Sequence, residues 1–334
     1  MKKILVTGAA GFLGSHLSEK LCSKGYDVIG VDNMTGGYSD NVPKNITFFS
    51  YDCCDLKKMH AVMKGVDIVY HCAATAHEGL SVFSPYTITK SIYGASVSTI
   101  TAAIANKVKR FVYCSSMARY GSQSFPFTED MKTKPEDPYG IAKVAAEDTL
   151  KLLAKVHGIE WNIAVPHNII GPNQKYDDPF RNVLSIFINR NLQGKPALIY
   201  GDGEQKRTFS YIDDVIYCLE KLAFDKNINK EIINVGPDEE SITIKNLANL
   251  VANEVGYNGK AVHMPARPQE VKIATCSAEK SRRLLNYSTK TTLKEAIKYT
   301  ANYIRKMGTR PFKYYLPIEI INDKTPQSWI KKTI

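Results

Sequence analysis

A tyrosine and a lysine that could together carry out proton transfer lie in the segment PYGIAK (138–143). Tyr139 and Lys143 are four positions apart, which places them on one face of a helix, one turn from each other. A free tyrosine has a pKa of about 10 and is a poor base at neutral pH. A neighbouring ammonium favours the phenolate, and about 3 pKa units, or about 4 kcal/mol, would bring it near neutrality. The pair therefore predicts a base for an alcohol proton, and Ser116 of YCSSMARYG (113–121) could share that proton.

The start of the chain is predicted to form a strand, a glycine turn and a helix. The glycines of TGAAGFLG are Gly8, Gly11 and Gly14, and the apolar residues with helical spacing after them begin with Phe12 and Leu13. This arrangement directs backbone N–H groups and a positive helix end at a phosphate. Asp32 and Asn33 end the next strand about 20 residues on, where a carboxylate accepts hydrogen bonds from a ribose 2′-hydroxyl and repels a 2′-phosphate. No Lys or Arg occurs in residues 33–40, so the pattern predicts bound NAD. Its positive nicotinamide ring would act together with Lys143 in favouring the Tyr139 phenolate.

Two further strand ends are predicted to contact this cofactor. Asp52 and Cys53 follow the third strand, and the Asp52 carboxylate is placed to bond the adenine. Ala73 and Ala74, in HCAATAH (71–77), are small enough to let the backbone approach a flat cofactor. The two histidines of that segment suggest a metal, but the first lies in a buried strand pattern and no carboxylate or thiol set accompanies them. We therefore predict structural histidines and no metal site.

Alternating strands and helices are predicted to position these residues. Strand patterns occur at 4–6, 28–31, 46–49, 68–72, 110–114 and 159–165, and helix patterns at 56–63, 87–106 and 139–157. Such alternation is typical of an α/β fold, a Rossmann-like doubly wound parallel sheet with helices on both faces. Ligands of these sheets bind beyond the carboxyl ends of the strands, which is where every motif above falls.

The later chain is predicted to form a smaller C-terminal α/β lobe that binds the substrate. We predict an NAD-binding domain at 1–171, with a return of the chain around 207–236. The substrate-binding lobe is predicted from 172–206 and 237–310. Residues 311–334 contain several aromatic side chains and are expected to form an ordered extension to which the sequence assigns no role.

Composition excludes several other classes of protein. The net charge of +11 comes from dispersed basic residues without a nucleic-acid-binding motif, so an anionic ligand is favoured over a nucleic acid. No apolar run of about 18 residues occurs, which argues against a membrane span. Seven scattered cysteines without a C-x-x-C pair are typical of reduced thiols, so the protein is predicted to be cytoplasmic.

These motifs together resemble the extended short-chain dehydrogenase/reductases, and within them the nucleotide-sugar epimerase/dehydratase group, over about residues 3–300. The Ser/Thr–Tyr–Lys triad of that family corresponds to Ser116, Tyr139 and Lys143. Its cofactor-binding positions correspond to the three glycines, Asp32 and Asp52. The chain departs from the family at N-x-x-G-T of the fourth helix, where it has SIYGAS with Ser91 in place of the Asn. This change puts one hydrogen bond to the cofactor in question.

Later segments resemble the substrate-binding motifs of the same family. Asn168, in VPHNIIGP, matches the position expected to touch the substrate diphosphate, and Asn182, in FRNVLSIF, matches a residue near the nucleotide base. Arg207 of GDGEQKRTFSYIDDV and Arg267 of PARPQEV match two phosphate clamps. Guanidinium groups suit phosphate oxygens, so the resemblance implies a nucleotide-diphosphate sugar as substrate.

The residues after Ser116 bear on the type of reaction. The resemblance implies that Tyr139 takes the proton of the sugar 4-hydroxyl while the C4 hydride moves to NAD⁺. Family 4,6-dehydratases place Asp-Glu after the triad Ser/Thr, decarboxylases keep a Glu nearby, and 3,5-epimerases have a Cys two places on. Here Met117, Ala118 and Arg119 follow, and none of them supplies these groups. The resemblance therefore predicts the reaction that needs only the triad and NAD, which is inversion at C4 through a transient 4-keto sugar. The predicted substrate is of the UDP-glucose or UDP-GlcNAc type. A nucleotide-sugar 4-dehydrogenase/reductase or a dehydratase is the alternative. A binding protein with a vestigial site is a third, against which the intact triad counts.

The resemblance also implies the size of the sugar pocket and the assembly. Ala274 matches a position that lines the sugar pocket in 4-epimerases, and its small side chain predicts room for an N-acetyl group. The helices at 87–106 and 139–157 are predicted to pair across a two-fold axis, which would give a homodimer.

Overall fold

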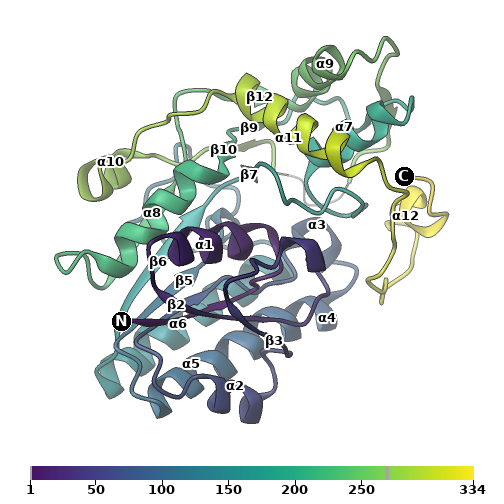
Figure 1. Cartoon of the computed structure of the whole chain (residues 1–334). Helices are drawn as coiled ribbons and strands as arrows, with labels where there is room; N and C mark the ends of the chain where they lie inside the picture. Colours follow the sequence, from purple (N-terminus) through teal and green to yellow (C-terminus); the bar gives the residue numbers. More distant parts are fainter. Residues whose placement is uncertain (1, 268–270) are drawn as a thin grey trace.

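A parallel sheet lies at the centre of the computed structural model, which describes residues 2–267 and 271–334 (Figure 1). Within these residues the sheet has seven strands, in the spatial order β11 (Glu231–Val235), β6 (Glu160–Pro166), β5 (Arg110–Cys114), β4 (Ile68–His71), β1 (Lys3–Thr7), β2 (Asp27–Asp32) and β3 (Thr47–Ser50). The order reverses between β1 and β4, and ligands of doubly wound sheets bind at such a switch point. The predicted Rossmann-like α/β fold is confirmed.

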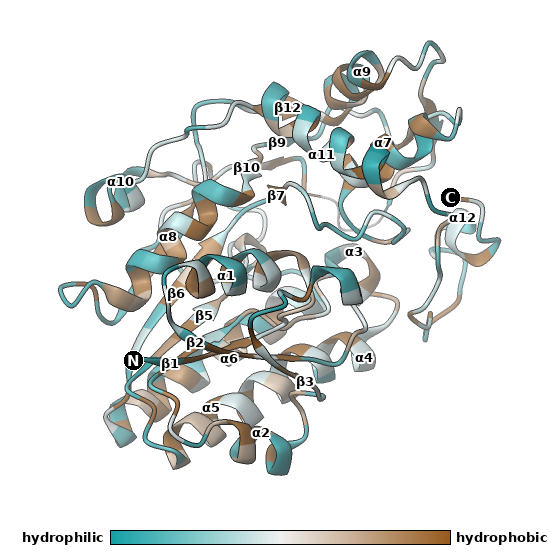
Figure 2. Ribbon diagram, viewed as in Figure 1, coloured by the Kyte–Doolittle hydropathy of each residue, from teal (hydrophilic) through white to brown (hydrophobic). Residues whose placement is uncertain are grey.

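Helices cover both faces of the sheet because successive strand residues point to opposite sides. Ile4 and Val6 pack under the helices α1 (Phe12–Ser23), α8 (Ile212–Phe224) and α10 (Glu279–Leu285). Leu5, between them, packs on the opposite side against α2 (Leu56–Val62), α5 (Ala95–Ala105) and α6 (Pro138–His157). Figure 2 shows hydrophobic residues in the strands and on the helix faces turned to the sheet.

Short helical elements lie near the strand ends. They are η1 (Ser39–Asn41), α3 (Glu78–Ser81), α4 (Pro85–Thr89) and η3 (Met117–Arg119). The helix predicted at 87–106 is one helical segment, made of α4, the π-helical turn η2 (Lys90–Gly94) and α5. π-Helical turns within helices often occur at functional sites.

The later chain forms a second group of elements on one side of the sheet (Figure 1). Its strands are β7 (Ile169–Ile170), β8 (Leu198–Tyr200), β9 (Lys206–Arg207), β10 (Ser210–Tyr211), β12 (Ile242–Thr243), β13 (Val262–Met264) and β14 (Ile273–Ala274), and its helices are α7 (Val183–Leu192), α9 (Ile244–Val255) and α11 (Leu293–Met307). The three helices pack around one apolar cluster that includes Leu184, Leu247 and Ile297. The exact boundaries of the two domains stay a prediction.

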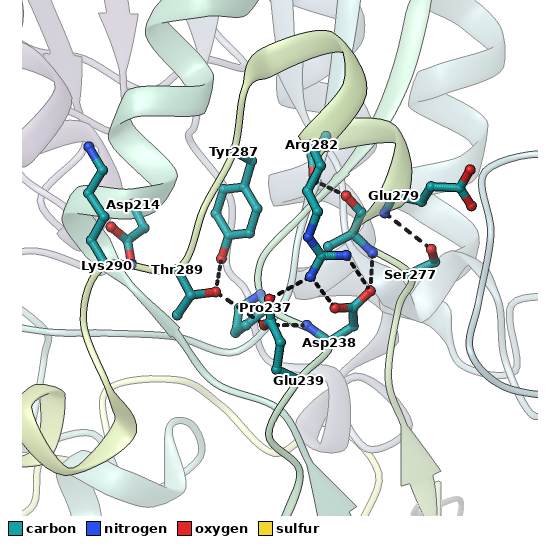
Figure 3. A network of polar contacts seen from close by, with 12 residues as sticks. Asp214, Pro237, Asp238, Glu239, Ser277, Glu279, Arg282, Tyr287, Thr289 and Lys290 are labelled. Carbon is teal, nitrogen blue, oxygen red and sulfur yellow. Dashed lines mark hydrogen bonds and ion pairs between the residues drawn. The ribbon is translucent and has the colours of Figure 1, made fainter.

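A polar network joins α10 to the loop that follows β11 (Figure 3). Arg282 donates from Nη1 to Asp238 Oδ2 at 3.1 Å, and its Nη2 contacts both Asp238 and Glu239. The backbone N–H of Ala278 donates to the same Oδ2 at 2.8 Å. The hydroxyl of Thr289 donates to Glu239 at 3.2 Å. This network ties the loop that follows β11 to α10 and to the residues on either side of that helix.

The C-terminal segment 311–334 contains α12 (Gln327–Ile330) and packs against both parts of the chain. Trp329 is 1% exposed and lies edge-on to Phe83 and Phe180. Leu316 joins the same apolar cluster. In the part of the chain that the structure describes, no helix is both long and apolar enough to cross a membrane.

Candidate active site

A cavity of about 490 Å³ runs along the carboxyl ends of the central strands and reaches α7 and the C-terminal segment. With the exception of Ala274, every residue that the sequence analysis placed at the site lines it: Gly8, Gly11, Phe12, Leu13, Gly14, Asp32, Asn33, Asp52, Cys53, Ala73, Ala74, Ser116, Tyr139, Lys143, Asn168, Asn182, Arg207 and Arg267. Ser91, at the position where the family has Asn, lines the cavity as well. The fold therefore brings the predicted catalytic, cofactor-binding and substrate-binding residues together.

The glycine turn between β1 and α1 is too tight for side chains. Gly8 has a φ of +72°, and a Cβ on it would lie 3.0 Å from the backbone of Ala73. A Cβ on Gly14 would lie 2.1 Å from the carbonyl oxygen of Gly8. Gly11 is the N-cap of α1 and offers no side chain to its first turn. The turn thus leaves the helix N-terminus open to a phosphate, which fits the diphosphate of a dinucleotide.

The carboxylate at the end of β2 fits a ribose hydroxyl. Asp32 is 6% exposed, and it accepts hydrogen bonds from the N–H groups of Ala10 at 3.0 Å and Met34 at 2.7 Å. Burial raises the pKa of this carboxyl, and the backbone hydrogen bonds oppose that rise. Asn33 Nδ2 donates to Asp52 Oδ2 at 3.4 Å, which joins two of the predicted strand ends. Together with the glycine turn, this donor and acceptor set fits NAD.

Lys143 is fixed between the sheet and the cavity. Its Nζ donates to the carbonyl oxygen of Cys114 at 2.7 Å and lies 5.9 Å from the centroid of the Tyr139 ring. The side chain belongs to α6, whose first turn is capped by Asp137 through a 2.9 Å hydrogen bond from Gly140 N. Burial lowers the pKa of Lys143 to about 8, so the ammonium form still predominates at neutral pH.

Tyr139 is buried, and its surroundings differ from the expectation. Burial raises the pKa of its hydroxyl to about 12, while the hydrogen bond with Ser116 lowers it. Glu78 raises the pKa and Arg181 lowers it. Lys143 alone does not bring this pKa towards neutrality, because burial disfavours the phenolate more than the protein's cations favour it. The prediction also counts the positive ring of a bound NAD⁺, and with that ring it stays a prediction.

The predicted substrate residues lie around the part of the cavity nearest α7. Asn168 Nδ2 donates to the carbonyl oxygen of Thr208 at 2.9 Å. Asn182 occupies the N-cap position of α7 with a φ of +68°, and its side chain makes no capping hydrogen bond. The Arg267 guanidinium lies 4.6 Å from the centroid of the Tyr200 ring. Asn168, Tyr200 and both arginines also line a side pocket of about 130 Å³. Residues 268–270 of the PARPQEV motif lie outside the described residues.

The histidines of the 71–77 segment have structural partners, as predicted. His71 bonds Thr7 Oγ1 at 2.8 Å and Ser96 Oγ at 3.1 Å, and burial lowers its pKa to about 3. His77 Nε2 lies 2.7 Å from Asp178 Oδ2. Among residues 2–267 and 271–334, no three His, Cys, Asp or Glu side chains are grouped as metal ligands.

The prediction for Ala274 is wrong. The register of β14 with β9 pairs Ala274 with Arg207, and its side chain joins the apolar cluster that contains Cys276 and Phe127. It is not one of the described residues that line the cavity, whereas Val271 is. The size of Ala274 therefore does not determine the room for the sugar.

Sequence reasoning missed several residues of the cavity wall. Glu78, Arg181, Tyr315 and Ile334 all line it. The residues after Ser116 carry no carboxylate, whereas Glu78 enters the cavity wall from the start of α3. No motif or spacing marks these positions, because their contacts with the site depend on how distant segments pack.

The comparisons with known proteins agree with this geometry. Residues 4–236 match the model of the NAD dependent epimerase/dehydratase family. A UDP-glucose 4-epimerase from Thermotoga maritima, solved with UDP-glucose, is 32% identical, with a TM-score of 0.87 over 91% of this chain and 99% of that one. A UDP-glucuronic acid 4-epimerase from Bacillus cereus, solved with UDP-glucuronic acid and NAD, is 28% identical, with a TM-score of 0.85 over 92% and 100%. A UDP-N-acetyl-alpha-D-glucosaminuronate decarboxylase from Bacillus cytotoxicus is 33% identical over 79% of this chain and 84% of its own length.

Proposed function

This chain belongs to the NAD-dependent epimerase/dehydratase family, and we propose that it inverts C4 of a nucleotide-diphosphate sugar of the UDP-glucose or UDP-GlcNAc type. The proposal rests on one observation: Ser116, Tyr139 and Lys143 line the same cavity as the glycine turn. The similarity to 4-epimerases over nine-tenths of the chain supports it.

In the proposed complex, the N-terminus of α1 and the glycine turn hold the diphosphate of NAD, and Asp32 accepts hydrogen bonds from the adenosine ribose. Bound NAD⁺ supplies a hydride acceptor and donor and a positively charged ring. Lys143 supplies a positive charge in the wall of the cavity. Its hydrogen bond to the Cys114 carbonyl oxygen fixes the position of that charge.

Tyr139 acts as the base in this proposal. Its Oη takes the proton of the sugar 4-hydroxyl as C4 is oxidised, and it returns the proton when C4 is reduced from the other face. Ser116 contacts Tyr139 and can pass the proton between the two oxygens. A pKa near 12 lies about 5 units above neutrality, so deprotonation at pH 7 costs about 7 kcal/mol. That pKa already includes the charges of the polypeptide, so the positive ring of a bound NAD⁺ would have to supply the further lowering.

Arg207 and Arg267 are proposed to hold the diphosphate of the substrate, together with Asn168. These residues surround a side pocket, so the nucleotide would be fixed there while the 4-keto sugar turns about its diphosphate link. Inversion requires this freedom, because the hydride returns to the opposite face of C4.

A dehydratase or decarboxylase is the second candidate, and Glu78 favours it. This carboxylate lines the same cavity as Tyr139 and raises its pKa, so a second acid or base is close to the triad. A decarboxylase is also among the relatives. Glu78→Gln separates the candidates: we expect it to leave C4 inversion largely intact, whereas dehydration or decarboxylation through Glu78 would be lost.

The test is to incubate the purified protein, without added NAD, with UDP-, GDP- and dTDP-sugars and to identify the products by NMR. The proposal predicts a C4 epimer and no net change in NAD. A 6-deoxy-4-keto product, a pentose product or a stoichiometric demand for NAD would overturn it in favour of a dehydratase, a decarboxylase or an oxidoreductase.

We also propose a homodimer formed through α5 and α6. Ile141, Leu152 and Val156 on α6 are more than half exposed, and burying such side chains would stabilise a helix-to-helix interface. A monomer in sedimentation experiments would contradict this.

We also propose that the protein is cytoplasmic. All seven cysteines are free thiols, which supports this location.

A further inference from the structure

We propose that the C-terminal segment 311–334 positions the catalytic Tyr139 through a chain of hydrogen bonds that begins at Tyr315. The proposal rests on the proposed function, because it assigns the segment a role in the work of Tyr139. The family match ends at residue 236, so the match does not include this segment.

The first link joins the segment to the cavity wall. The hydroxyl of Tyr315 donates to Asp178 Oδ2 at 2.6 Å, and His77 Nε2 lies 2.7 Å from the same oxygen. Asp178 and His77 are each 1% exposed. Their contacts lower the pKa of the Asp178 carboxyl against the effect of burial, so a charged carboxylate holds both partners. Charge-assisted hydrogen bonds in such surroundings are short and strong.

The second link runs from His77 to the helix of the catalytic tyrosine. His77 is the N-cap of α3, and its carbonyl oxygen accepts from Ser81 N at 3.0 Å. The Ser81 hydroxyl lies 2.7 Å from the Glu78 carbonyl oxygen and 3.2 Å from Asp137 Oδ1, so its proton is shared between these two acceptors. The same Asp137 oxygen accepts from Gly140 N at 2.9 Å, which caps α6 beside Tyr139. A shift at Tyr315 can thus reach the first turn of α6 through groups in direct contact.

Further contacts hold the segment rigidly enough to act as a support. Glu319 accepts hydrogen bonds from the N–H groups of Tyr86 and Thr87, each at 2.9 Å, at the start of α4. The hydroxyls of Ser328 and Tyr200 lie 2.7 Å apart, and Tyr200 lines the cavity. Trp329 is buried among apolar side chains of the main body. The segment is therefore attached on both sides of the cavity to which Tyr315 contributes.

A C-terminal segment that positions Tyr139 and one that only packs against the surface predict different effects on kcat and KM. Misplacing a base lowers the rate of the chemical step, and displacements of about 1 Å can cost up to about 100-fold. Substrate affinity depends mainly on the nucleotide and diphosphate contacts, which the proposal places elsewhere in the cavity. Removing the Tyr315 hydroxyl should therefore lower kcat more than it changes KM.

The experiment compares Tyr315→Phe with Tyr299→Phe in the NAD-loaded protein. Tyr299 is 44% exposed on α11 and does not line the cavity among the described residues, so it controls for the loss of one phenol hydroxyl. We measure kcat and KM on the sugar that the wild type inverts, and hydrogen exchange at the Gly140 amide. We expect Tyr315→Phe to lower kcat about tenfold with KM within about threefold, and to speed Gly140 exchange about tenfold. Tyr299→Phe should match the wild type in all three.

Ser81→Ala interrupts the chain at its middle and keeps the test decisive if Tyr315→Phe fails to fold. We expect the same two effects, and the double variant should lose no more kcat than the stronger single variant, because both act on one network. Wild-type kcat and Gly140 exchange in the folded variants, or losses that multiply in the double variant, would overturn the proposal. If the wild type inverts no nucleotide sugar, the proposed function fails, while Gly140 exchange still decides whether the segment is coupled to α6.

Discussion

Replacing Lys143 by methionine should stabilise the unliganded protein while abolishing its activity. Lys143 is 3% exposed, and burial lowers its pKa from 10.5 to about 8. The fall of about 2.5 pH units corresponds to about 3 kcal/mol of unfavourable free energy at neutral pH, at about 1.4 kcal/mol per unit. Methionine has a similar shape without the charge, but it leaves the Cys114 carbonyl without its donor, which costs about 1 kcal/mol. The free energy of unfolding should therefore rise by about 2 kcal/mol at pH 7.

The pH dependence of this gain has a definite sign. A lysine with a lowered pKa in the folded state binds fewer protons there than in the unfolded state between pH 8 and 10.5. The free energy of unfolding of the wild type therefore rises with pH across that window relative to the variant. The full cost of the buried charge applies below pH 8 and disappears above pH 10.5. The advantage of Lys143→Met should shrink by about 2 kcal/mol between pH 7 and pH 9.5.

Urea unfolding at both pH values measures this difference, with Lys155→Met as the control. Lys155 is exposed on the same helix, and its replacement should change the free energy of unfolding by less than about 0.5 kcal/mol at either pH. Two results would refute the view that Lys143 keeps a buried charge at a cost in stability because function needs it. One is a Lys143→Met variant that is less stable than the wild type at pH 7. The other is a gain in the free energy of unfolding that does not change with pH.

Three further predictions concern the base and the cofactor site. Tyr139→Phe should lower kcat at least about 100-fold, while calorimetry should find nucleotide-sugar affinity within about threefold of the wild type. Gly14→Ala should lower the free energy of unfolding by about 2 kcal/mol or more and weaken NAD binding, because its Cβ would lie 2.1 Å from the Gly8 carbonyl oxygen. Gly36→Ala has open space around its Cβ and should unfold at the wild-type urea concentration. Asp32→Asn should weaken NAD binding about tenfold, as measured by fluorescence titration, and wild-type affinity would remove Asp32 from the cofactor site.

The sequence was informative wherever function depends on local geometry or on the general topology of parallel sheets. Gly8 and Gly14 could be identified because a tight turn before a helix excludes side chains. Asp32 and Asp52 could be placed together because the carboxyl ends of parallel strands meet at one edge. Tyr139 and Lys143 could be paired because a helix brings residues four apart onto one face.

The sequence was uninformative where distant segments meet. Glu78 and Tyr315 enter the cavity through the packing of α3 and the C-terminal segment, and no periodicity encodes that contact. The extent to which burial raises the pKa of Tyr139 was hidden from the sequence for a related reason. A nearby cation can be read from spacing, whereas the burial that outweighs it depends on the whole fold. Ala274 was misplaced because the register of a two-residue strand depends on its partner β9.

The most direct test of the central claim follows the hydrogen on C4. Substrates deuterated at C4, UDP-glucose and UDP-GlcNAc, are incubated with the NAD-loaded protein without added cofactor, and the products are analysed by NMR. The account predicts inverted products that keep deuterium at C4, because the hydride leaves and returns within one site. Deuterium lost to solvent, left on the protein-bound cofactor or absent from an inverted C4 would contradict it.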